Sequence, residues 1–287
     1  MSLLLSIVNF PLEILGLNIC KIQYEGIKLY MTIDALEEIE ANLFYNQYAV
    51  IRKIQKGDTV VDLGAHQGTF TIPASKLSGE NGLVIAVEPI HLNFSLLVNN
   101  VMLNRCKNVL AFRRAVYIEN RKQITMYLPI GLHTLSESAS VFLRKELFPT
   151  KKMRRLWVPT IDMWHILSLV SNLRGHDTVD FLKIDIEGYE LPLLTLNNSW
   201  LQHVNFITGE FHNDVYGESG EKRIIESLHE QGFKAGIVDV KIHKSDLLKK
   251  WLRLKMQANI MGYCLYRALT CIKPGVINLR LFYAEKG

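Results

Sequence analysis

Residues 59–68, with the sequence TVVDLGAHQG, constrain the fold of this chain more than any other segment. An apolar run ends around Asp62 and passes directly into a turn between Gly64 and Gly68. An amphipathic stretch, typical of a helix, follows over residues 70–77. A strand, a glycine-containing loop and a helix in this order form the first unit of a nucleotide-binding α/β sheet.

The glycine spacing in this loop distinguishes two classes of cofactor. A dinucleotide site needs the pattern G-x-G-x-x-G, which lets a pyrophosphate lie against the N-terminus of the helix. Here His66 fills the middle position and Asp62 precedes the loop, and both disfavour a diphosphate. S-adenosylmethionine has a sulfonium, an ammonium and a ribose but no phosphate. We therefore expect S-adenosylmethionine rather than NAD.

A second apolar strand, at residues 83–87, ends in a second carboxylate, Glu88. An acid at this position can accept hydrogen bonds from both hydroxyls of a ribose, so we assign Glu88 to the ribose. The alternative is a solvated acid ahead of Pro89. Ala115 and Val116, just past the third strand, are assigned to the adenine, with plain packing as the alternative.

A length of 287 residues favours one large or two small domains. The hydrophobic fraction of 48% is sufficient for a globular core. We expect a docking or cap segment over residues 1–55 and one domain over residues 56–287. The net charge of +5 is mild. The four cysteines show no pairing at zinc-site spacing, which indicates reduced thiols of a cytoplasmic protein.

The first 17 residues are apolar, but they lack a basic leader region and are too short to cross a bilayer. We expect this segment to cover the sheet or an oligomer surface. Peripheral membrane contact is the alternative. The oligomeric state stays open.

From residue 56 onward, the sequence alternates between strand and helix patterns. Strands are expected at 59–63, 83–87, 109–112, 179–185, 204–210, 233–240 and 277–284, and helices at 70–77, 90–103, 161–170 and 221–231. Residues 115–118 and 123–128 are typical of a hairpin. Residues 156–159 are expected to be extended, with Thr160 as the N-cap of the next helix. Such alternation implies a doubly wound parallel sheet.

In such a sheet, ligands bind outside the carboxyl ends of the strands. Asp62, Glu88, Asp185 and Glu210 all lie at or near such ends. We therefore expect these four acids to converge on one edge.

Two segments, at residues 131–155 and 245–273, interrupt the alternation of strand and helix patterns. The second is typical of a helix that begins at Ser245 and has an apolar stripe. Residues 241–273 contain eight Lys or Arg and one acid, a charge of +7 by count. A packed surface helix is the first interpretation, and a lid or a contact with an anionic surface is the alternative. No nucleic-acid-binding fold accompanies these charges, so we expect no nucleic-acid partner.

Residues 181–190, with the sequence FLKIDIEGYE, resemble a signature of the FkbM-type family of S-adenosylmethionine-dependent methyltransferases. Further pieces at residues 61–68, 87–89, 158–162 and 209–212 are similar to the family pattern, so the resemblance covers about residues 55–240. His66, where the family more often has Asn, and the segment 245–273 depart from it.

This resemblance implies a Rossmann-like seven-stranded sheet, mostly parallel with one antiparallel edge strand and with helices on both faces. It also implies O-methylation of a hydroxyl on a sugar, a glycolipid or another small metabolite. A methyltransferase-like scaffold without catalysis and an enzyme recruited to membranes by its basic helix are the alternatives.

Methyl transfer from a sulfonium needs alignment of acceptor, methyl and sulfur, which contributes about 7–11 kcal/mol, and a hydroxyl acceptor also needs a base. Asp185, at the end of the central strand, is expected to orient the acceptor or act in catalysis. Lys183 should point to the same face and keep Asp185 ionised, or form a structural pair with it. Glu210 and His212 share the end of the next strand, and His212 is a plausible base.

Glu187, Glu210 and His212 are candidates for binding the acceptor, whereas Glu190 could bind it or cap the next helix. The expected cofactor-binding residues are Asp62, Gly64, Ala65, His66, Gln67, Gly68, Glu88, Pro89, Ala115, Val116 and Asp185. The alternatives are loop capping for Asp62, ordinary turn roles for the glycines and loop packing for His66. Asp185, Glu187, Glu210 and His212 could form an oxygen-rich metal site, but no spacing requires one and we expect none.

Overall fold

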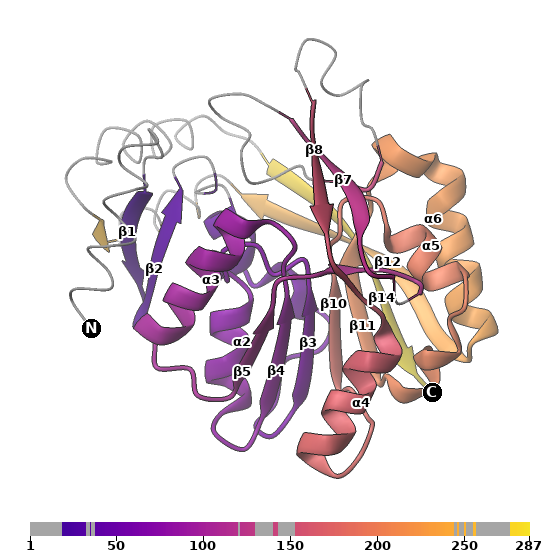
Figure 1. Ribbon diagram of the computed structural model, residues 1–287, viewed down its shortest axis with the longest axis horizontal. Coiled ribbons are helices and arrows are strands. Elements are labelled where there is room, and N and C mark those ends of the chain that lie inside the picture. The colour runs from indigo at the N-terminus through magenta and orange to yellow at the C-terminus, as the bar shows by residue number, and fades with distance from the viewer. Residues whose placement is uncertain are drawn as a thin grey trace.

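The structure, a computed structural model, contains a seven-stranded sheet with helices on both faces (Figure 1). It describes residues 19–32, 35, 38–119, 121–129, 140–142, 153–243, 246, 250, 255–256 and 276–287. The Rossmann-like α/β class predicted from the sequence is confirmed.

The sheet has the strand order β12-β14-β11-β10-β3-β4-β5. Its strands are β3 (Thr59–Leu63), β4 (Leu83–Val87), β5 (Val109–Phe112), β10 (Phe181–Ile184), β11 (Phe206–Glu210), β12 (Phe233–His243) and β14 (Val276–Lys286). Strand β14 runs antiparallel to β11 and β12, whereas the other neighbours are parallel. The antiparallel strand therefore lies one place inside the edge strand β12 rather than at the edge.

Every residue of β3 and β4 is buried, because helices cover both faces of the sheet. Val60 and Val84 face one side, which is packed by α2 (Thr71–Ser78) and α3 (His91–Leu103). Val61 and Ile85 face the other, where they join a core with α4 (Met163–Arg174), α5 (Glu190–Thr195) and α6 (Asn213–Glu230). The two-residue alternation of each strand thus divides its side chains between two helical layers.

The N-terminal segment contributes more structure than a cap. Strands β1 (Ile19–Tyr24) and β2 (Ile27–Thr32) form a hairpin that packs beside α3. A π-helix, η2 (Ile39–Phe44), and a 3-10 helix, η3 (Gln47–Ala49), then lead into β3. Residues 1–17 lie outside the described residues, so their predicted docking role stays a prediction.

The predicted helix at 245–273 is wrong at residues 255–256. Strand β13 (Lys255–Met256) pairs there with β1 and completes a three-stranded sheet. Strand pairing of the backbone excludes a continuous helix. Apart from Asp246 and Lys250, the rest of the segment lies outside the described residues.

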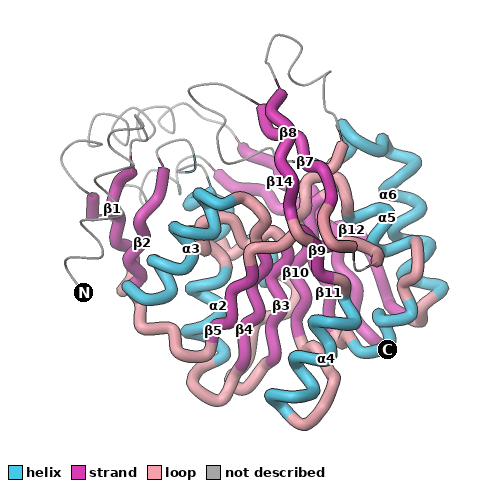
Figure 2. The backbone as a smooth tube through the Cα atoms, in the orientation of Figure 1, coloured by secondary structure: helices cyan, strands magenta, loops and turns pink. Residues whose placement is uncertain are grey.

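The predicted hairpin at residues 115–128 is also wrong. Strand β6 (Ala115–Val116) pairs in parallel with β9 (Thr160–Ile161). Strand β7 (Ile124–Pro129) pairs with β8 (Met153–Val158), and this ribbon stands above the sheet (Figure 2). Local alternation predicted the strands correctly, but their partners come from a distant part of the chain. Residues 130–139 and 143–152, within the predicted insert, are not described.

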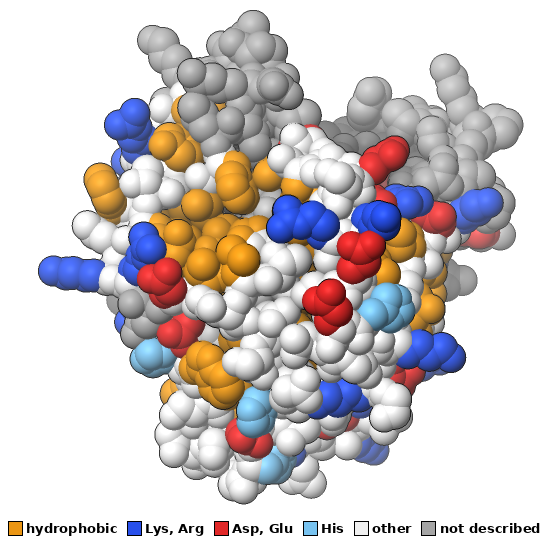
Figure 3. All heavy atoms as spheres, turned by 90° about the vertical axis from the view of Figure 1, so that its right-hand side faces the viewer, with side chains coloured by type: hydrophobic (Ala, Val, Ile, Leu, Met, Phe, Trp, Pro, Cys, Tyr) orange, Lys and Arg blue, Asp and Glu red, His pale blue; other side chains and the backbone are white. Residues whose placement is uncertain are grey.

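On the side of the molecule that carries α5 and α6, acidic and basic side chains are interspersed around apolar ones (Figure 3). Among the described residues, no helix has the length and apolar character that crossing a membrane requires.

The N-cap of helix α4 is Asp162, so the prediction of Thr160 as the N-cap is wrong. The Asp162 carboxylate accepts a hydrogen bond of 2.9 Å from the backbone N–H of His165, whereas Thr160 lies in β9 and its hydroxyl accepts from the backbone N–H of Arg121. Asp162→Ala should lower the free energy of unfolding by about 1 kcal/mol, and Asp162→Asn by much less. Urea unfolding followed by circular dichroism checks this; equal losses in both variants would contradict the capping role.

Candidate functional site

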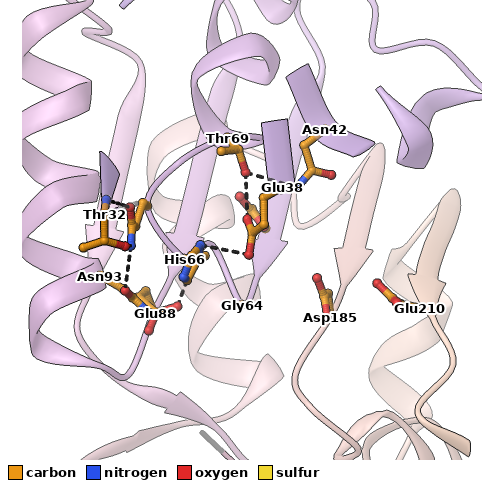
Figure 4. A network of polar contacts seen from close by, with 12 residues as sticks. Thr32, Glu38, Asn42, Gly64, His66, Thr69, Glu88, Asn93, Asp185 and Glu210 are labelled. Carbon is orange, nitrogen blue, oxygen red and sulfur yellow. Dashed lines mark hydrogen bonds and ion pairs between the residues drawn. The ribbon is translucent and has the colours of Figure 1, made fainter. Parts of the chain in front are cut away.

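Predicted site residues come together at the carboxyl edge of the sheet. In the spatial order β5, β4, β3 and β10, the strand ends are followed by Ala115, Glu88, Gly64 and Asp185, and the next strand, β11, ends in Glu210. Figure 4 shows Asp185 and Glu210 side by side, with the Gly64 loop and Glu88 farther along. Because neighbouring strands are only about 4.8 Å apart, this edge forms a continuous row of functional groups.

A cavity of roughly 650 Å³, including its mouth, opens along this row. Its lining joins apolar side chains such as Val116 and Met126 to four carboxylates, those of Glu38, Glu88, Asp185 and Glu187. Pro89 and Ala115, two of the residues predicted to bind the cofactor, also line the cavity. The lining therefore combines an apolar part, which includes Val116 and Met126, with an acidic part, which includes Asp185 and Glu187.

The loop after β3 passes so close to β10 that only glycine fits at position 64. Gly64 has a φ of +78°, and a Cβ there would lie 1.7 Å from the carbonyl oxygen of Asp185. Gly68 has a φ of +93°, and its Cβ would meet Leu97 at 3.0 Å. His66 adopts a φ of +49°, which a non-glycine residue seldom does. The loop thus presents His66 and the Gly64 backbone to the cavity.

Three other loop residues predicted to bind the cofactor, Ala65, Gln67 and Gly68, are not among the residues that line the cavity. Ala65 is buried and packs in a small core cluster near α3. Gln67 is fully buried, and its amide bonds to Thr32 and Asn93, with 3.0 Å between the Gln67 Oε1 and the Thr32 backbone nitrogen. Gln67 therefore fastens the loop to β2 and α3.

Glu88 is only 4% exposed and is held by two backbone donors. Its carboxylate accepts hydrogen bonds from the N–H of His66 at 2.9 Å and of Ile90 at 2.8 Å. Burial raises the pKa of Glu88, although His66 and these donors oppose the rise. The two bonds fix the carboxylate at the cavity wall in one orientation.

Asp62 lies beneath the cavity rather than in its lining. Its side chain is fully buried, with one oxygen 3.2 Å from the ammonium of Lys183 and the other accepting from the hydroxyl of Thr71. Lys183 is also buried, donates to the Gly64 carbonyl at 2.6 Å and lies 3.5 Å from Asp185. Burial lowers the pKa of Lys183, but Asp62 and Asp185 raise it above its usual value. Lys183 therefore remains charged between two carboxylates.

Asp185 is ionised by this environment. Burial opposes ionisation, but Lys183, His212 and a hydrogen bond from Tyr48 together lower the pKa of Asp185. The Tyr48 hydroxyl donates to Asp185 at 2.8 Å and lies 3.4 Å from Glu210. Sequence analysis missed Tyr48, because nothing near it resembles a site motif and it comes from η3, distant in sequence.

Glu210 and His212 occupy contrasting electrostatic environments. Burial and the charge of Asp185 raise the pKa of Glu210 to about 7, although His212 opposes this. Burial lowers the pKa of His212, but Glu190, Glu187 and Asp185 raise it well above the usual value. At neutral pH, His212 is therefore positively charged and Glu210 is poised to exchange a proton.

The predicted acceptor residues surround His212. Its Nδ1 lies 3.0 Å from the fully buried Glu190, and its Nε2 lies 3.7 Å from Glu187 and 3.8 Å from Asp185. Glu190 also accepts a 2.8 Å hydrogen bond from the N–H of Ile186, which precedes α5, and its predicted role in acceptor binding stays a prediction. Asp185, Glu190 and His212 each bring a potential metal ligand within 4.8 Å of the others, and the charged imidazole already compensates these acids.

The structure adds a second residue that the sequence did not suggest. Glu38, just before η2, lines the cavity with its carboxylate 2.9 Å from Nδ1 of His66 (Figure 4). Its other oxygen accepts a 3.1 Å hydrogen bond from Thr69. The only available signal was its position in the segment expected to act as a cap.

Comparison with known sequences decides the family. A model of the methyltransferase FkbM domain matches residues 62–235, more than half of the chain. The chain belongs to the FkbM methyltransferase family. A search of curated proteins found no match to this methyltransferase. The family predicted from the sequence motifs is thus confirmed, and β1, β2, Glu38 and Tyr48 lie outside the matched range.

Solved structures show a similar fold at low identity. The precorrin-6y C5,15-methyltransferase of Geobacter metallireducens GS-15 aligns with a TM-score of 0.50 and 12% identity, over 92% of this chain and 100% of that one. Aeropyrum pernix fibrillarin, with natively bound S-adenosyl-L-methionine, aligns with a TM-score of 0.43 and 14% identity, over 94% of this chain and 82% of that one. A SAM-dependent O-methyltransferase of Thermotoga maritima aligns with a TM-score of 0.43 and 11% identity, over 86% of this chain and 64% of that one.

The buried pair of Lys183 and Asp62 should be essential for stability. Lys183→Met leaves two carboxylates without their counter-ion and should lower the free energy of unfolding by about 3–5 kcal/mol. Adding Asp62→Asn should recover part of this loss, because it removes one of the unpaired charges. Denaturant unfolding of both variants and of Asp62→Asn measures the coupling. Strictly additive losses would show that the pair does not act as a unit.

Proposed function

We propose that this methyltransferase binds S-adenosylmethionine in the cavity and transfers the methyl group to a hydroxyl of a sugar, a glycolipid or another small metabolite. The observation that carries the proposal is the order of groups along the sheet edge. Beyond β5, Ala115 and Val116 line the cavity after Arg114; the buried carboxylate of Glu88 follows β4, and Gly64 and Asp185 follow β3 and β10. Adenine, ribose, sulfonium and methionine follow one another in the same order along the cofactor.

The acidic lining supports a cationic cofactor. Four carboxylates line the cavity against one arginine, Arg114, which donates to the carbonyl of Thr160. Lys183, which lies beneath Gly64, neutralises chiefly Asp62 and Asp185. A sulfonium and an ammonium would be attracted to this surface, whereas a pyrophosphate would be repelled. Glu88 is fixed by two backbone N–H groups and retains acceptor capacity for ribose hydroxyls.

The acceptor is proposed to bind beside Asp185, where Glu187, Glu210 and His212 converge. Asp185 would hold the hydroxyl in line with the methyl and sulfur, which is the main catalytic requirement of this displacement. Glu210 would take the hydroxyl proton, because its pKa of about 7 suits a base at neutral pH. His212, which carries charge, would stabilise the ionised carboxylates rather than act as the base. Lys183 would position Asp185 from below.

The sugar or glycolipid class rests on the family resemblance, and carboxylates that can accept bonds from several hydroxyls support it. We propose no nucleic-acid partner. Membrane recruitment by residues 1–17 and 245–273 concerns segments almost wholly outside the described residues, and it stays a prediction, as do a cytoplasmic location and a homo-oligomer.

The ribose assignment predicts a loss of cofactor affinity in Glu88→Ala. Charge-assisted hydrogen bonds are worth about 1.5–3 kcal/mol each, so the dissociation constant for S-adenosylhomocysteine should rise at least about tenfold. Calorimetric titration measures it, with NAD as a control ligand that should not bind. Unchanged affinity in a folded variant would remove Glu88 from the ribose site. Failure of the wild type to bind would favour the scaffold alternative.

Catalysis by Glu210 predicts a pH profile. A carboxyl group must be ionised to act as a base, so turnover should rise as the pH increases through about 7, where the pKa of Glu210 lies. Glu210→Gln should lower turnover about a hundredfold or more and abolish this rise, with cofactor affinity retained. Asp185→Asn should also lose turnover while still binding S-adenosylhomocysteine. Both are measured by transfer of a labelled methyl group in an acceptor screen.

The stability of Glu210→Gln supplies an independent check of the same pKa. A carboxyl whose pKa is raised in the folded state stabilises the fold when protonated and loses this contribution as the pH rises through about 7. The melting temperature of Glu210→Gln relative to wild type should therefore be more favourable at pH 8 than at pH 5. An identical difference at both values would contradict the raised pKa.

A further inference from the structure

We infer that Glu38, from the N-terminal segment, binds the α-ammonium group at the methionine end of the cofactor. This inference rests on the proposed cofactor and assigns a residue outside the range matched by the family. Asp62, which the sequence analysis counted among the cofactor-binding residues, does not take this role.

The acid that precedes the glycine loop is not available to a ligand. The Asp62 side chain is 0% exposed, and its oxygens already contact Lys183 and Thr71. The methionine end therefore needs another carboxylate. Of the three acids other than Glu38 that line the cavity, Glu88 lies at the ribose position, Asp185 is compensated by Lys183, and Glu187 lies 3.7 Å from the charged imidazole of His212.

Glu38 is placed where the ammonium should lie. Its carboxylate lies 2.9 Å from His66, in the middle of the glycine loop, and 3.1 Å from Thr69, directly after the loop. Figure 4 shows Glu38 on the opposite side of His66 from Glu88, toward Asp185. If the adenine lies beyond β5 and the ribose at Glu88, the strand order places the methionine end of the cofactor between the Gly64 loop and Asp185, close to Glu38.

The Glu38 carboxylate is preorganised and retains negative charge for a ligand. Thr69, which donates to it, is itself fixed by a 3.0 Å hydrogen bond from the amide of Asn42. Among the residues that the structure describes, His66 alone lies within ion-pair distance of Glu38. With 27% of its side chain exposed, Glu38 can reach a ligand without breaking the fold. A primary ammonium can donate to Glu38 while Thr69 holds the other oxygen.

A competing role for Glu38 is only to orient His66. The two roles differ in which ligands they affect. S-adenosylhomocysteine carries the ammonium, whereas 5′-methylthioadenosine keeps adenine and ribose but lacks the amino-acid end. A residue that binds the ammonium discriminates between these ligands, and a residue that only shapes the loop changes the binding of both or of neither.

The test is calorimetric titration of both ligands into the full-length wild type, Glu38→Gln and Glu119→Gln. Glu119 is the control, because its replacement also removes one carboxylate, with 51% of its side chain exposed, but it is not among the residues that line the cavity. Glu38→Gln should weaken the binding of S-adenosylhomocysteine at least tenfold and change the binding of methylthioadenosine less than twofold. Glu119→Gln should change the binding of either ligand by less than threefold.

Equal weakening of both ligands, or unchanged S-adenosylhomocysteine affinity in folded Glu38→Gln, would overturn the inference while leaving the proposed function intact. Wild-type protein that binds neither ligand would overturn the proposed function and the inference with it. If Glu38→Gln does not fold, the same titrations with Glu38→Asp test the inference. This variant keeps the carboxylate, but its side chain is shorter by one methylene, so the charge lies farther from the ligand. Weakening confined to S-adenosylhomocysteine would support the inference, and equal affinities or equal losses would reject it.

Discussion

The site depends on one buried ammonium, that of Lys183. It lies between the carboxylates of Asp62 and Asp185 and donates to the carbonyl of Gly64. Two carboxylates on neighbouring strands would repel each other in a buried setting, and Lys183 converts this repulsion into attraction. A single charge thus joins β3 to β10, fixes the glycine loop and keeps Asp185 ionised at the cavity.

Close packing of backbone complements this ion pair. Gly64 approaches the Asp185 carbonyl so closely that no side chain could be accommodated between them. The carboxyl ends of β3 and β10 consequently act as one rigid unit, with the proposed cofactor on one side and the acid cluster around His212 on the other. A methyl donor and an acceptor held by such a unit would need little reorganisation to align.

The N-terminal segment completes the site from outside the family core. Tyr48 bridges Asp185 and Glu210, and Glu38 faces the cavity from above the glycine loop. Both residues belong to a stretch that also forms the β1–β2 hairpin beside α3. Loss of this segment would therefore remove polar groups of the site and not only a cover over the sheet.

The sequence by itself determined the fold class, most strands of the central sheet, the family and the convergence of Glu88, Asp185 and Glu210 on one edge. Strand periodicity and the ordering of strand ends are local properties, so motifs such as residues 181–190 carry them directly. Only the tertiary structure decided the partners of β6 and β7, the strand at Lys255–Met256, the burial of Asp62 and the entry of Tyr48 and Glu38. These depend on contacts between residues distant in the chain, and no local pattern of side chains encodes which distant segment fills a given space.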